Sequence, residues 1–350
     1  MVGTHVTTMG GVSTVVRGYM DGGLLQRFDA RYVATHRDGS HLVKFFAAVK
    51  AYLKVSVLLL TMKSPLLHIH LSSRASFWRK FGICLLAMLT RRPYLLHVHG
   101  SEFMKFYRQE SGPRAQRLVR FAFRHAVLVL ALSNEWRANI LEICPGARVE
   151  VLPNAVPLPP AREGAGSATE IVFLGRLGER KGTFDLVRAF AKVFQDFPHA
   201  SLTCAGDGVI DEIVQLTRQL HVDDRVRCPG WLNAEQAHKL LSTAGIFVLP
   251  SYAEGLPMSL LEAMSWGLPV VSSPVGGIPQ VVRHQENGLL VEPGDVDNLA
   301  ASLASLLGDK DQRSRLGEAA RETIENHFSL QAAIEKLSGI YASFGVPQRA

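Results

Sequence analysis

Two glutamates, Glu254 and Glu262, flank a predicted helix start in the C-terminal half of the sequence. The apolar run 246–249 before them predicts a short buried strand, which a Pro-Ser pair ends. Pro257 suits the first position of a helix, where a missing N–H group costs least. The stretch is therefore predicted to form a strand, a loop and a helix start, with one carboxylate on each side of that start.

This helix start is a candidate nucleotide site. The N–H groups of a helix N-terminus carry partial positive charge and attract phosphate groups. Glu262, three residues after Ser259 on the same helix face, is placed to accept ribose hydroxyls, and Glu254 to accept hydroxyls of the group that the phosphates carry. The alternative is one glutamate that favours the helix dipole and one solvated loop charge, and the two glutamates alone favour that alternative. The candidate donor-binding residues here are Gly255, Leu256, Pro257, Met258, Ser259 and Glu262.

A second loop, Gly175–Gly182, carries two basic residues between a predicted strand and a predicted helix. Arg176 and Lys181 could hold a diphosphate, because a guanidinium and an ammonium at the carboxyl end of a strand offer several donors to its oxygens. Two solvated loop charges explain this loop about equally well. It is not a Walker A loop, since no Ser or Thr follows the lysine and the glycine spacing differs.

Two pairs of histidines, His68 with His70 and His97 with His99, each occupy one face of a predicted strand. Four histidines suggest a metal, but no Asp, Glu or Cys accompanies them at ligand spacing, and such histidines more often pack in a core. His99 differs because Gly100 follows it at a strand end, where ligands bind. We therefore expect a functional role for His99, a structural role for the other three, and no metal.

Three further motifs give weaker signals. Asp295 and Asp297 have the DxD spacing of metal-dependent sugar transferases, but Asn298 and an apolar helix follow, so helix capping explains them better. Gly276–Gly277 could bring N–H groups close to a sugar or form a tight turn, and the turn is favoured. Ala205–Gly208 contains a GxG without the third glycine of a dinucleotide site.

Predicted strands alternate with predicted helices along the whole chain, the pattern of parallel sheets covered by helices on both faces. One series of strands runs from 2–6 to 149–152 and a second from 170–174 to 289–291. These series predict an α/β protein with two Rossmann-like, doubly wound domains that face each other across a cleft at the carboxyl ends of their strands.

The predicted N-terminal domain comprises residues 1–153, followed by a Pro-rich linker at 154–168. The C-terminal domain comprises 169–328, and a closing helix lies in 329–350. The first strand is shorter than a central parallel strand usually is, so we expect that the natural domain has a few more residues or that the start codon is assigned too late. Gly10–Gly11 after this strand would let a backbone approach a ligand closely.

The totals fit this description. At 350 residues the chain can bury two cores, and 47% hydrophobic with 20% charged residues is ordinary for an α/β protein. The apolar runs at 55–62 and 83–89 are shorter than the ~18 residues of a spanning helix. Residues 1–15 lack a signal-peptide pattern, and the four cysteines lack CxxC spacing, so a cytoplasmic location is expected.

The net charge of +7 divides unequally between the domains. Residues 1–153 hold 21 Lys+Arg against 8 Asp+Glu, whereas residues 154–350 hold 17 against 23. Basic residues beside Trp and Phe suit an anionic membrane surface. Nucleic acid is a competing partner without a recognition motif, and a solvated helix face is the plain alternative. The basic residues and their apolar neighbours are Arg74, Trp78, Arg79, Lys80, Phe81, Arg91 and Arg92 and, on another helix, Arg114, Arg117, Arg120 and Arg124.

Taken together, the motifs resemble those of the retaining glycosyltransferases of family 4, which have the two-domain GT-B fold. The resemblance extends over nearly the whole chain and is most specific over 170–295. The matching residues are Gly10-Gly11, His99-Gly100, Pro153-Asn154, Gly175-Arg-Leu with Lys181-Gly182, Gly230-Trp-Leu232, Glu254-x7-Glu262 with its flanking residues, Gly276-Gly-Ile-Pro and Asn287-Gly-Leu-Leu.

The resemblance implies a role for each candidate residue. Arg176 and Lys181 would neutralise the leaving diphosphate in place of a metal ion, and Glu254 would hold the transferred sugar. The remaining assignments are Glu262 for the ribose, the backbone at Leu232 for the base, His99 for the sugar from the other domain, and Gly10 and Gly11 for the diphosphate or the acceptor. The closing helix would return to the first domain.

The resemblance implies a retaining, metal-independent hexosyltransferase that needs no cofactor. It would move a sugar from a nucleotide diphosphate to a saccharide acceptor, lipid-linked, in bacterial exopolysaccharide or surface glycan assembly. Its location would be cytoplasmic and peripheral on the inner face of the plasma membrane. The rival interpretations are a nucleotide-sugar epimerase, a sugar phosphorylase, or an inactive subunit that binds sugar nucleotides.

Overall fold

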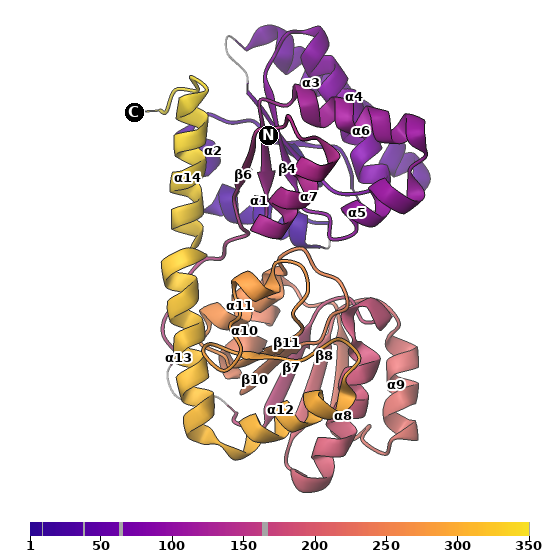
Figure 1. The fold of residues 1–350 in the computed structure, drawn as a ribbon, viewed down its shortest axis with the longest axis vertical. Coiled ribbons are helices and arrows are strands. Elements are labelled where there is room, and N and C mark those ends of the chain that lie inside the picture. The colour runs from indigo at the N-terminus through magenta and orange to yellow at the C-terminus, as the bar shows by residue number, and fades with distance from the viewer. Residues whose placement is uncertain (9, 38, 63–65, 163–166, 350) are drawn as a thin grey trace. The chain divides into compact units, whose positions relative to one another are not determined.

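The computed structural model describes residues 1–8, 10–37, 39–62, 66–162 and 167–349. The chain forms two compact units: unit 1 comprises Met1–Ala155 with Leu330–Ala350, and unit 2 comprises Val156–Ser329. Each unit is built on one six-stranded sheet whose paired strands are all parallel (Figure 1). The predicted α/β fold with two doubly wound domains is confirmed.

Unit 1 has the strand order β2-β1-β3-β4-β5-β6. Its strands are β1 (Val2–Gly3), β2 (Val33–Ala34), β3 (Leu67–Leu71), β4 (Tyr94–Val98), β5 (Leu128–Ala131) and β6 (Val149–Val151). Its helices are α1 (Gly11–Asp21), α2 (Leu24–Arg27), α3 (His41–Thr61), α4 (Ala75–Leu89), α5 (Phe103–Lys105), a π-helix (Phe106–Glu110), α6 (Pro113–His125), α7 (Asn134–Ile143) and α14 (Leu330–Ser343). The closing helix thus belongs to the same unit as the N-terminal residues.

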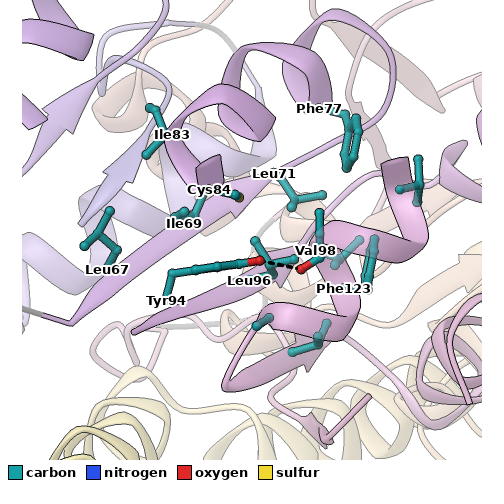
Figure 2. Close-up of a cluster of buried hydrophobic side chains, with 14 of the residues drawn as sticks. Leu67, Ile69, Leu71, Phe77, Ile83, Cys84, Tyr94, Leu96, Val98 and Phe123 are labelled. Atoms are coloured by element: carbon teal, nitrogen blue, oxygen red, sulfur yellow. Dashed lines mark hydrogen bonds between the residues drawn. The ribbon is translucent and has the colours of Figure 1, made fainter. Parts of the chain in front are cut away.

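The central strands of unit 1 are buried on both faces, which explains their continuous apolar sequences. Because successive strand residues point to opposite faces, Leu67, Ile69 and Leu71 pack toward one layer of helices. Figure 2 shows these side chains in one cluster with Phe77 of α4 and Tyr94 of β4. The Tyr94 hydroxyl donates a hydrogen bond of 2.7 Å to the carbonyl oxygen of Ala122. This cluster is the core on the side of α3, α4 and α6.

The opposite face of the same strands carries the histidines. Helix α14 covers this face beside α1, where Gly22 lets the two helices approach, since a Cβ there would lie 2.3 Å from Ile334 Cδ1. The ring of Tyr341 on α14 lies edge-on to His68, at a centroid distance of 5.9 Å. The last helix therefore completes the second layer of unit 1.

Unit 2 has the strand order β12-β11-β10-β7-β8-β9. Its strands are β7 (Glu170–Leu174), β8 (Ser201–Ala205), β9 (Val226–Gly230), β10 (Ile246–Leu249), β11 (Val270–Ser272) and β12 (Leu289–Leu290). Its helices are a 3₁₀ turn (Glu179–Lys181), α8 (Thr183–Asp196), α9 (Ile210–Gln219), α10 (Ala234–Thr243), α11 (Met258–Ser265), a 3₁₀ turn (Ile278–Gln280), α12 (Val296–Gly308) and α13 (Lys310–His327). From β7 the chain first builds the sheet toward β9, and then returns to add β10 on the other side of β7.

The structure corrects three predicted segments. The first strand ends at Gly3 instead of Val6, because turns follow directly. A helical segment at 103–110 was not predicted. Within the described residues, the predicted linker 154–168 packs on unit 2 from Val156 onward, through a bridge from Val156 to Ser329 and donation from Arg162 to the Ser242 carbonyl. Its Gly-Ala-rich part at 163–166 lies outside the described residues.

In the part of the chain that is described, no helix has both the length and the apolar character needed to cross a bilayer.

Candidate functional site

The loops that follow β7 and β10 lie side by side in unit 2. The two strands are paired neighbours, with Ile246 opposite Ile171, so their carboxyl ends meet at one point of the sheet edge. The chain reverses its direction of growth between these strands, and open α/β sheets bind ligands at such a switch point. The loops are bonded to each other, since Tyr252 N–H donates to the Arg180 carbonyl at 2.9 Å and the Arg180 guanidinium to the Ala253 carbonyl at 3.0 Å.

This arrangement joins Lys181 and Glu254, which the sequence placed in separate loops. The Lys181 ammonium donates to Glu254 Oε1, and the Ser251 hydroxyl donates to the same oxygen at 2.7 Å. The lysine side chain is 13% exposed and the glutamate 6%. An ammonium and a carboxylate withdrawn this far from water must be paired, because either charge alone would be costly to bury. The pair therefore forms a nearly buried, neutralised centre at the switch point.

Glycines allow the backbone around this pair to close. Gly182 has φ of +67°, and a Cβ there would lie 2.0 Å from the Pro250 carbonyl oxygen. Gly276 has φ of +58°, and its Cβ would lie 2.0 Å from the Glu254 carbonyl oxygen. Gly277 N–H donates to the Gly255 carbonyl at 2.6 Å. The Gly276–Gly277 pair is thus a tight turn, as the sequence favoured, and the turn supports the backbone that carries Glu254.

Helix α11 begins at Met258, one residue later than predicted, with Pro257 as its N-cap. No side chain caps this helix. The first N–H groups of a helix have no carbonyl partner within it, so this end is suited to an anion. Met258 is buried and Ser259 half-buried, and Gly255 to Pro257 form the buried approach to the helix. The predicted anion site thus begins in the same loop as the Lys181–Glu254 pair.

Glu262 lies in the second turn of α11. Burial raises the pKa of its carboxyl to about 7. It lines a pocket of about 440 Å³, and it alone of the predicted site residues does so. The other lining residues are Pro157, Leu158, Pro159, Pro160, His238, Lys239, Ser242, Ser265 and Trp266. Glu262 is therefore a poorly hydrated carboxyl beside open space, which a hydroxyl-bearing ligand could occupy.

The other two predicted donor-site residues of unit 2 are more open to solvent. The Arg176 side chain is 70% exposed and lies 3.7 Å from the Asp207 carboxylate, in the loop after β8. The two loops are joined because Leu177 N–H donates to the Asp207 carbonyl at 2.7 Å. Leu232 is half-buried and lies between β9 and α10, so its backbone is at the same sheet edge. Arg176 does not take part in the Lys181–Glu254 pair.

In unit 1, His99 follows β4 and ends a stack of four histidines. Its Nε2 lies 2.9 Å from Nδ1 of His70, and its ring lies 4.1 Å from that of His97, between centroids. His68 continues the stack, with Nε2 3.2 Å from His97 Nδ1 and Nδ1 2.6 Å from the Tyr341 hydroxyl. Burial lowers the pKa of His99 to about 3 and holds the pKa values of the other three well below the ordinary range. All four rings are neutral at pH 7.

The stack also brings nitrogens of His68, His70 and His97 within 4.8 Å of one another, close enough to suggest a metal site. No metal was predicted at these histidines from the sequence. The rings of His68 and His70 are stacked almost in parallel, with 18° between their planes, so their in-plane lone pairs do not converge on one point. The buried Lys80 lowers the pKa of His99 further through its charge. A divalent cation would therefore need both a rearrangement of the rings and a counter-charge.

Gly10 and Gly11 begin the first helix of unit 1. Gly10 is the N-cap of α1 with φ of +132°, and a Cβ there would meet nothing within 4 Å. The helix has no side-chain cap, and the Ser13 hydroxyl donates to the Gly10 carbonyl at 2.7 Å. Gly10 thus leaves open space beside an uncapped helix start.

Three residues of these loops were not predicted: Ser251, Arg180 and Asp207. Ser251 stands three residues before Glu254 in the same loop, and this short separation was the available signal. Arg180 joins the loops after β7 and β10, because its carbonyl accepts from Tyr252 N–H and its guanidinium donates to the Ala253 carbonyl. Asp295 was interpreted correctly, because its side chain accepts from Asn298 N–H and caps α12.

Two family models match the chain in succession. The model described as Glycosyltransferase Family 4 matches residues 10–158, and the model described as Glycosyl transferases group 1 matches residues 161–323. Together they cover both units.

Characterised relatives match mainly one half of the chain. An N-acetyl-alpha-D-glucosaminyl L-malate synthase of Bacillus anthracis is 33% identical over 172 residues, which are 49% of this chain and 44% of the relative. A lipopolysaccharide core biosynthesis glycosyltransferase of Rhizobium meliloti is 33% identical over 177 residues, 50% of each chain. The chain thus spans about half the length of the curated relatives it matches.

Solved structures match the whole fold at low identity. A sucrose-phosphate synthase of Thermosynechococcus elongatus superposes with a TM-score of 0.79 at 20% identity and 98% coverage of both chains. The Anabaena protein HepE in complex with UDP superposes with a TM-score of 0.75 at 18% identity and the same coverage. These likenesses establish the fold of the chain.

Proposed function

Because this chain belongs to the glycosyltransferases of family 4 and has their two-domain GT-B fold, we propose that it transfers a hexose-type sugar from a nucleoside diphosphate to a saccharide acceptor with retention of configuration. The observation that carries this proposal is the buried Lys181–Glu254 pair at the switch point of unit 2. It places a cation, a carboxylate and an uncapped helix N-terminus in adjoining loops, and these are the groups that a sugar diphosphate requires.

The donor would be held by unit 2. The diphosphate would lie against Lys181 and the N–H groups at the start of α11, with Arg176 turning toward it from solvent. Glu254 would accept hydrogen bonds from the sugar hydroxyls, the N–H groups of Gly255, Leu256 and Met258 would donate to them, and Glu262 would accept from the ribose hydroxyls. In this arrangement Lys181 and Arg176 neutralise the leaving group, so we propose that transfer needs neither a metal ion nor another cofactor.

The reaction would proceed on one face of the sugar. The bond from C1 to the diphosphate oxygen breaks as the acceptor oxygen forms a bond to C1 on the same side. The acceptor proton passes to the leaving diphosphate oxygen, so that no protein nucleophile is needed. The protein stabilises the charge that develops on the diphosphate and on the sugar. His99, whose ring stays neutral, would contact the sugar from unit 1 as a hydrogen-bond donor or acceptor.

The acceptor would be a lipid-linked saccharide, and the enzyme a cytoplasmic protein at the inner face of the plasma membrane. The charge difference between the two halves of the sequence and the relatives' names support this part. One relative is named for lipopolysaccharide core biosynthesis and another for colanic acid biosynthesis.

A thermal-shift screen tests the donor assignment. UDP, GDP, ADP and their sugars are added in EDTA, and a ligand at ~100 times its dissociation constant should stabilise the fold by about 2.7 kcal/mol. One nucleotide that stabilises the protein in EDTA would support a metal-independent donor site. If none stabilises it, or if stabilisation appears only with a divalent cation, the proposed donor chemistry is wrong. The anomeric configuration of the product, determined by NMR, tests retention.

A further inference from the structure

Three neighbouring helices of unit 1 carry most of the exposed large apolar side chains of this protein. Helix α4 contacts both α3 and α6, and Figure 1 shows the three together on one side of the unit 1 sheet. Of the 16 exposed large hydrophobic residues in the described chain, 13 belong to these helices. We call this surface the three-helix face. Its exposed apolar residues are Leu42, Val43, Phe45, Phe46, Val49, Leu53, Val57, Leu60, Trp78, Leu85, Leu89, Leu118 and Phe121.

Helix α3 is apolar on two opposite sides. Ala51, Val55 and Leu59, each at most 3% exposed, pack into the core of unit 1. Turning about 100° per residue places a second stripe on the far side of the helix. This stripe consists of Leu42, Phe46, Val49, Leu53 and Leu60, whose exposed fractions range from 40% to 73%. An apolar stripe that the fold does not use indicates an interaction surface.

The charges of this face all have one sign. The sequences of α3, α4 and α6 contain nine Lys and Arg residues and no Asp or Glu. Within the described residues, none of the α3 lysines, Lys44, Lys50 and Lys54, forms an ion pair. Two basic residues that were predicted to contact a membrane, Lys80 and Arg74, are not free to do so. Lys80 is 1% exposed and donates to the Ser76 hydroxyl at 2.8 Å, and Arg74 is bound to the carboxylates of Glu102 and Glu110.

The combination of apolar and cationic groups decides the partner. A second copy of the chain docked through the same face would oppose cations to cations, since a twofold interface brings each patch against itself. Nucleic acid would neutralise the cations but leave the apolar stripe in water. An anionic lipid surface satisfies both, because headgroups attract lysines while the boundary of the acyl chains buries apolar side chains.

We propose that unit 1 binds anionic phospholipid membranes through the three-helix face, with α3 lying in the interface parallel to the surface. The middle of α3 carries Lys50 and Lys54 beside the exposed stripe, which suits a helix at headgroup depth. Its phenylalanines and leucines would enter the acyl boundary, and the arginines of α6 would extend the cationic contact. This inference rests on the proposed function for its purpose, which is delivery of a lipid-linked acceptor, but the binding can be measured without any transfer reaction.

The test is cosedimentation of the full-length protein with vesicles of phosphatidylcholine, with and without phosphatidylglycerol. Wild type should bind the anionic vesicles and lose affinity as salt rises. The double variant Phe46→Ser/Leu53→Ser should bind at least about tenfold more weakly, because two exposed apolar side chains no longer enter the lipid. Lys50→Glu/Lys54→Glu should lose a similar factor on anionic vesicles only. Lys310→Glu, a change of sign at one exposed site of unit 2, should bind like wild type.

Two further measurements keep the outcomes distinct. Circular dichroism establishes that the α3 variants fold, and sedimentation velocity reports their oligomeric state. If wild type fails to bind anionic vesicles, or if the serine variant binds as well as wild type, the inference is wrong. The inference is also wrong if wild type does not bind vesicles but forms a dimer that the serine variant cannot form, because the three-helix face would then be an interface between two copies of the chain. Vesicle binding without any nucleotide binding or sugar transfer would refute the proposed function and leave the membrane inference standing.

Discussion

Replacing Glu254 by glutamine tests whether this carboxylate competes with the donor diphosphate for Lys181. The carboxylate accepts hydrogen bonds from both the Lys181 ammonium and the Ser251 hydroxyl, and its side chain is 6% exposed. Glutamine keeps the shape of the side chain and an oxygen that can accept these bonds. The substitution therefore removes the negative charge and little else.

The size of the effect follows from the loss of that charge. A hydrogen bond to a charged group contributes about 1.5–3 kcal/mol and a neutral one about 0.5–1.5 kcal/mol, so the ligand-free protein should lose roughly 1–2 kcal/mol. Unpairing a fully buried charge would cost about 3–5 kcal/mol, which is the upper limit because glutamine still accepts a bond. In a domain of this size each kcal/mol lowers Tm by about 2–4 °C. In wild type the Lys181 ammonium must leave a carboxylate to bind the diphosphate, whereas in the variant it leaves only a neutral amide. Nucleoside diphosphate binding should therefore tighten about three- to tenfold.

Isothermal titration with the nucleotide that stabilises wild type measures this effect. Lys181→Met is the matched variant and should weaken binding by at least about tenfold, while sugar transfer falls in both variants. The double variant completes a cycle for stability, whose coupling energy should be on the order of 1–2 kcal/mol. If Glu254→Gln weakens nucleotide binding as much as Lys181→Met does, or if the cycle shows no coupling, the competition between carboxylate and diphosphate does not exist.

Three other predictions concern stability. In urea denaturation, Gly276→Ala should lower the free energy of unfolding by more than about 2 kcal/mol, because its Cβ would meet the Glu254 carbonyl. The control Gly230→Ala, with φ of +78° and open space around it, should lower the free energy of unfolding by only about 1 kcal/mol. Equal losses would contradict the steric argument. Because burial raises the pKa of Glu262 to about 7, the folded protein binds this proton more tightly than the unfolded chain, and stability falls as pH rises from about 4.5 to 7. The free energy of unfolding of Glu262→Gln, relative to that of wild type, should therefore rise by roughly 1–2 kcal/mol from pH 4.5 to pH 8. This rise is smaller than full burial would give, because the side chain is half-buried. A difference in stability that does not change with pH would refute the prediction. The lowered pKa values of the stacked histidines have the opposite consequence, since the unfolded chain binds more protons below about pH 6.5 and unit 1 loses stability as pH falls. The hydrogen-exchange protection factors of unit 1 should therefore fall between pH 6.5 and 5 by more than those of unit 2, and His97→Asn should reduce that fall.

Most strands of both sheets were predictable because they are short apolar runs between residues that break strands. β7 and β10 begin and end at the predicted residues. Buried parallel strands need apolar side chains on both faces, and this requirement leaves a local signal that a single sequence shows. The segment at 103–110 has no such signal. Its π-helix is tied to Arg74, more than thirty residues away, by an ion pair to Glu110.

The site was predicted residue by residue but not as an arrangement. Lys181 and Glu254 were both candidates, and their contact depends on β10 lying beside β7, an order that neither strand specifies by itself. The partner of Arg176 could not be predicted for the same reason, since it depends on β8 occupying the other side of β7. Helix α3 illustrates a different limit. Its apolar residues lie on two opposite sides of the helix, so the sequence indicates a helix but not which of the two sides the protein covers.

The return of α14 to unit 1 affects the order in which the protein can fold as it is synthesised. Unit 2 is one continuous stretch, Val156–Ser329, whereas unit 1 is assembled from two pieces of chain that the whole of unit 2 separates. Domains generally fold in the order in which they leave the ribosome. Here the first piece of unit 1 leaves before unit 2, yet the layer that contains Tyr341 and covers its histidines is translated after unit 2. Unit 2 can therefore reach its native state on the ribosome while unit 1 still exposes one face of its sheet, and nascent unit 1 is the part that chaperones and proteases would meet.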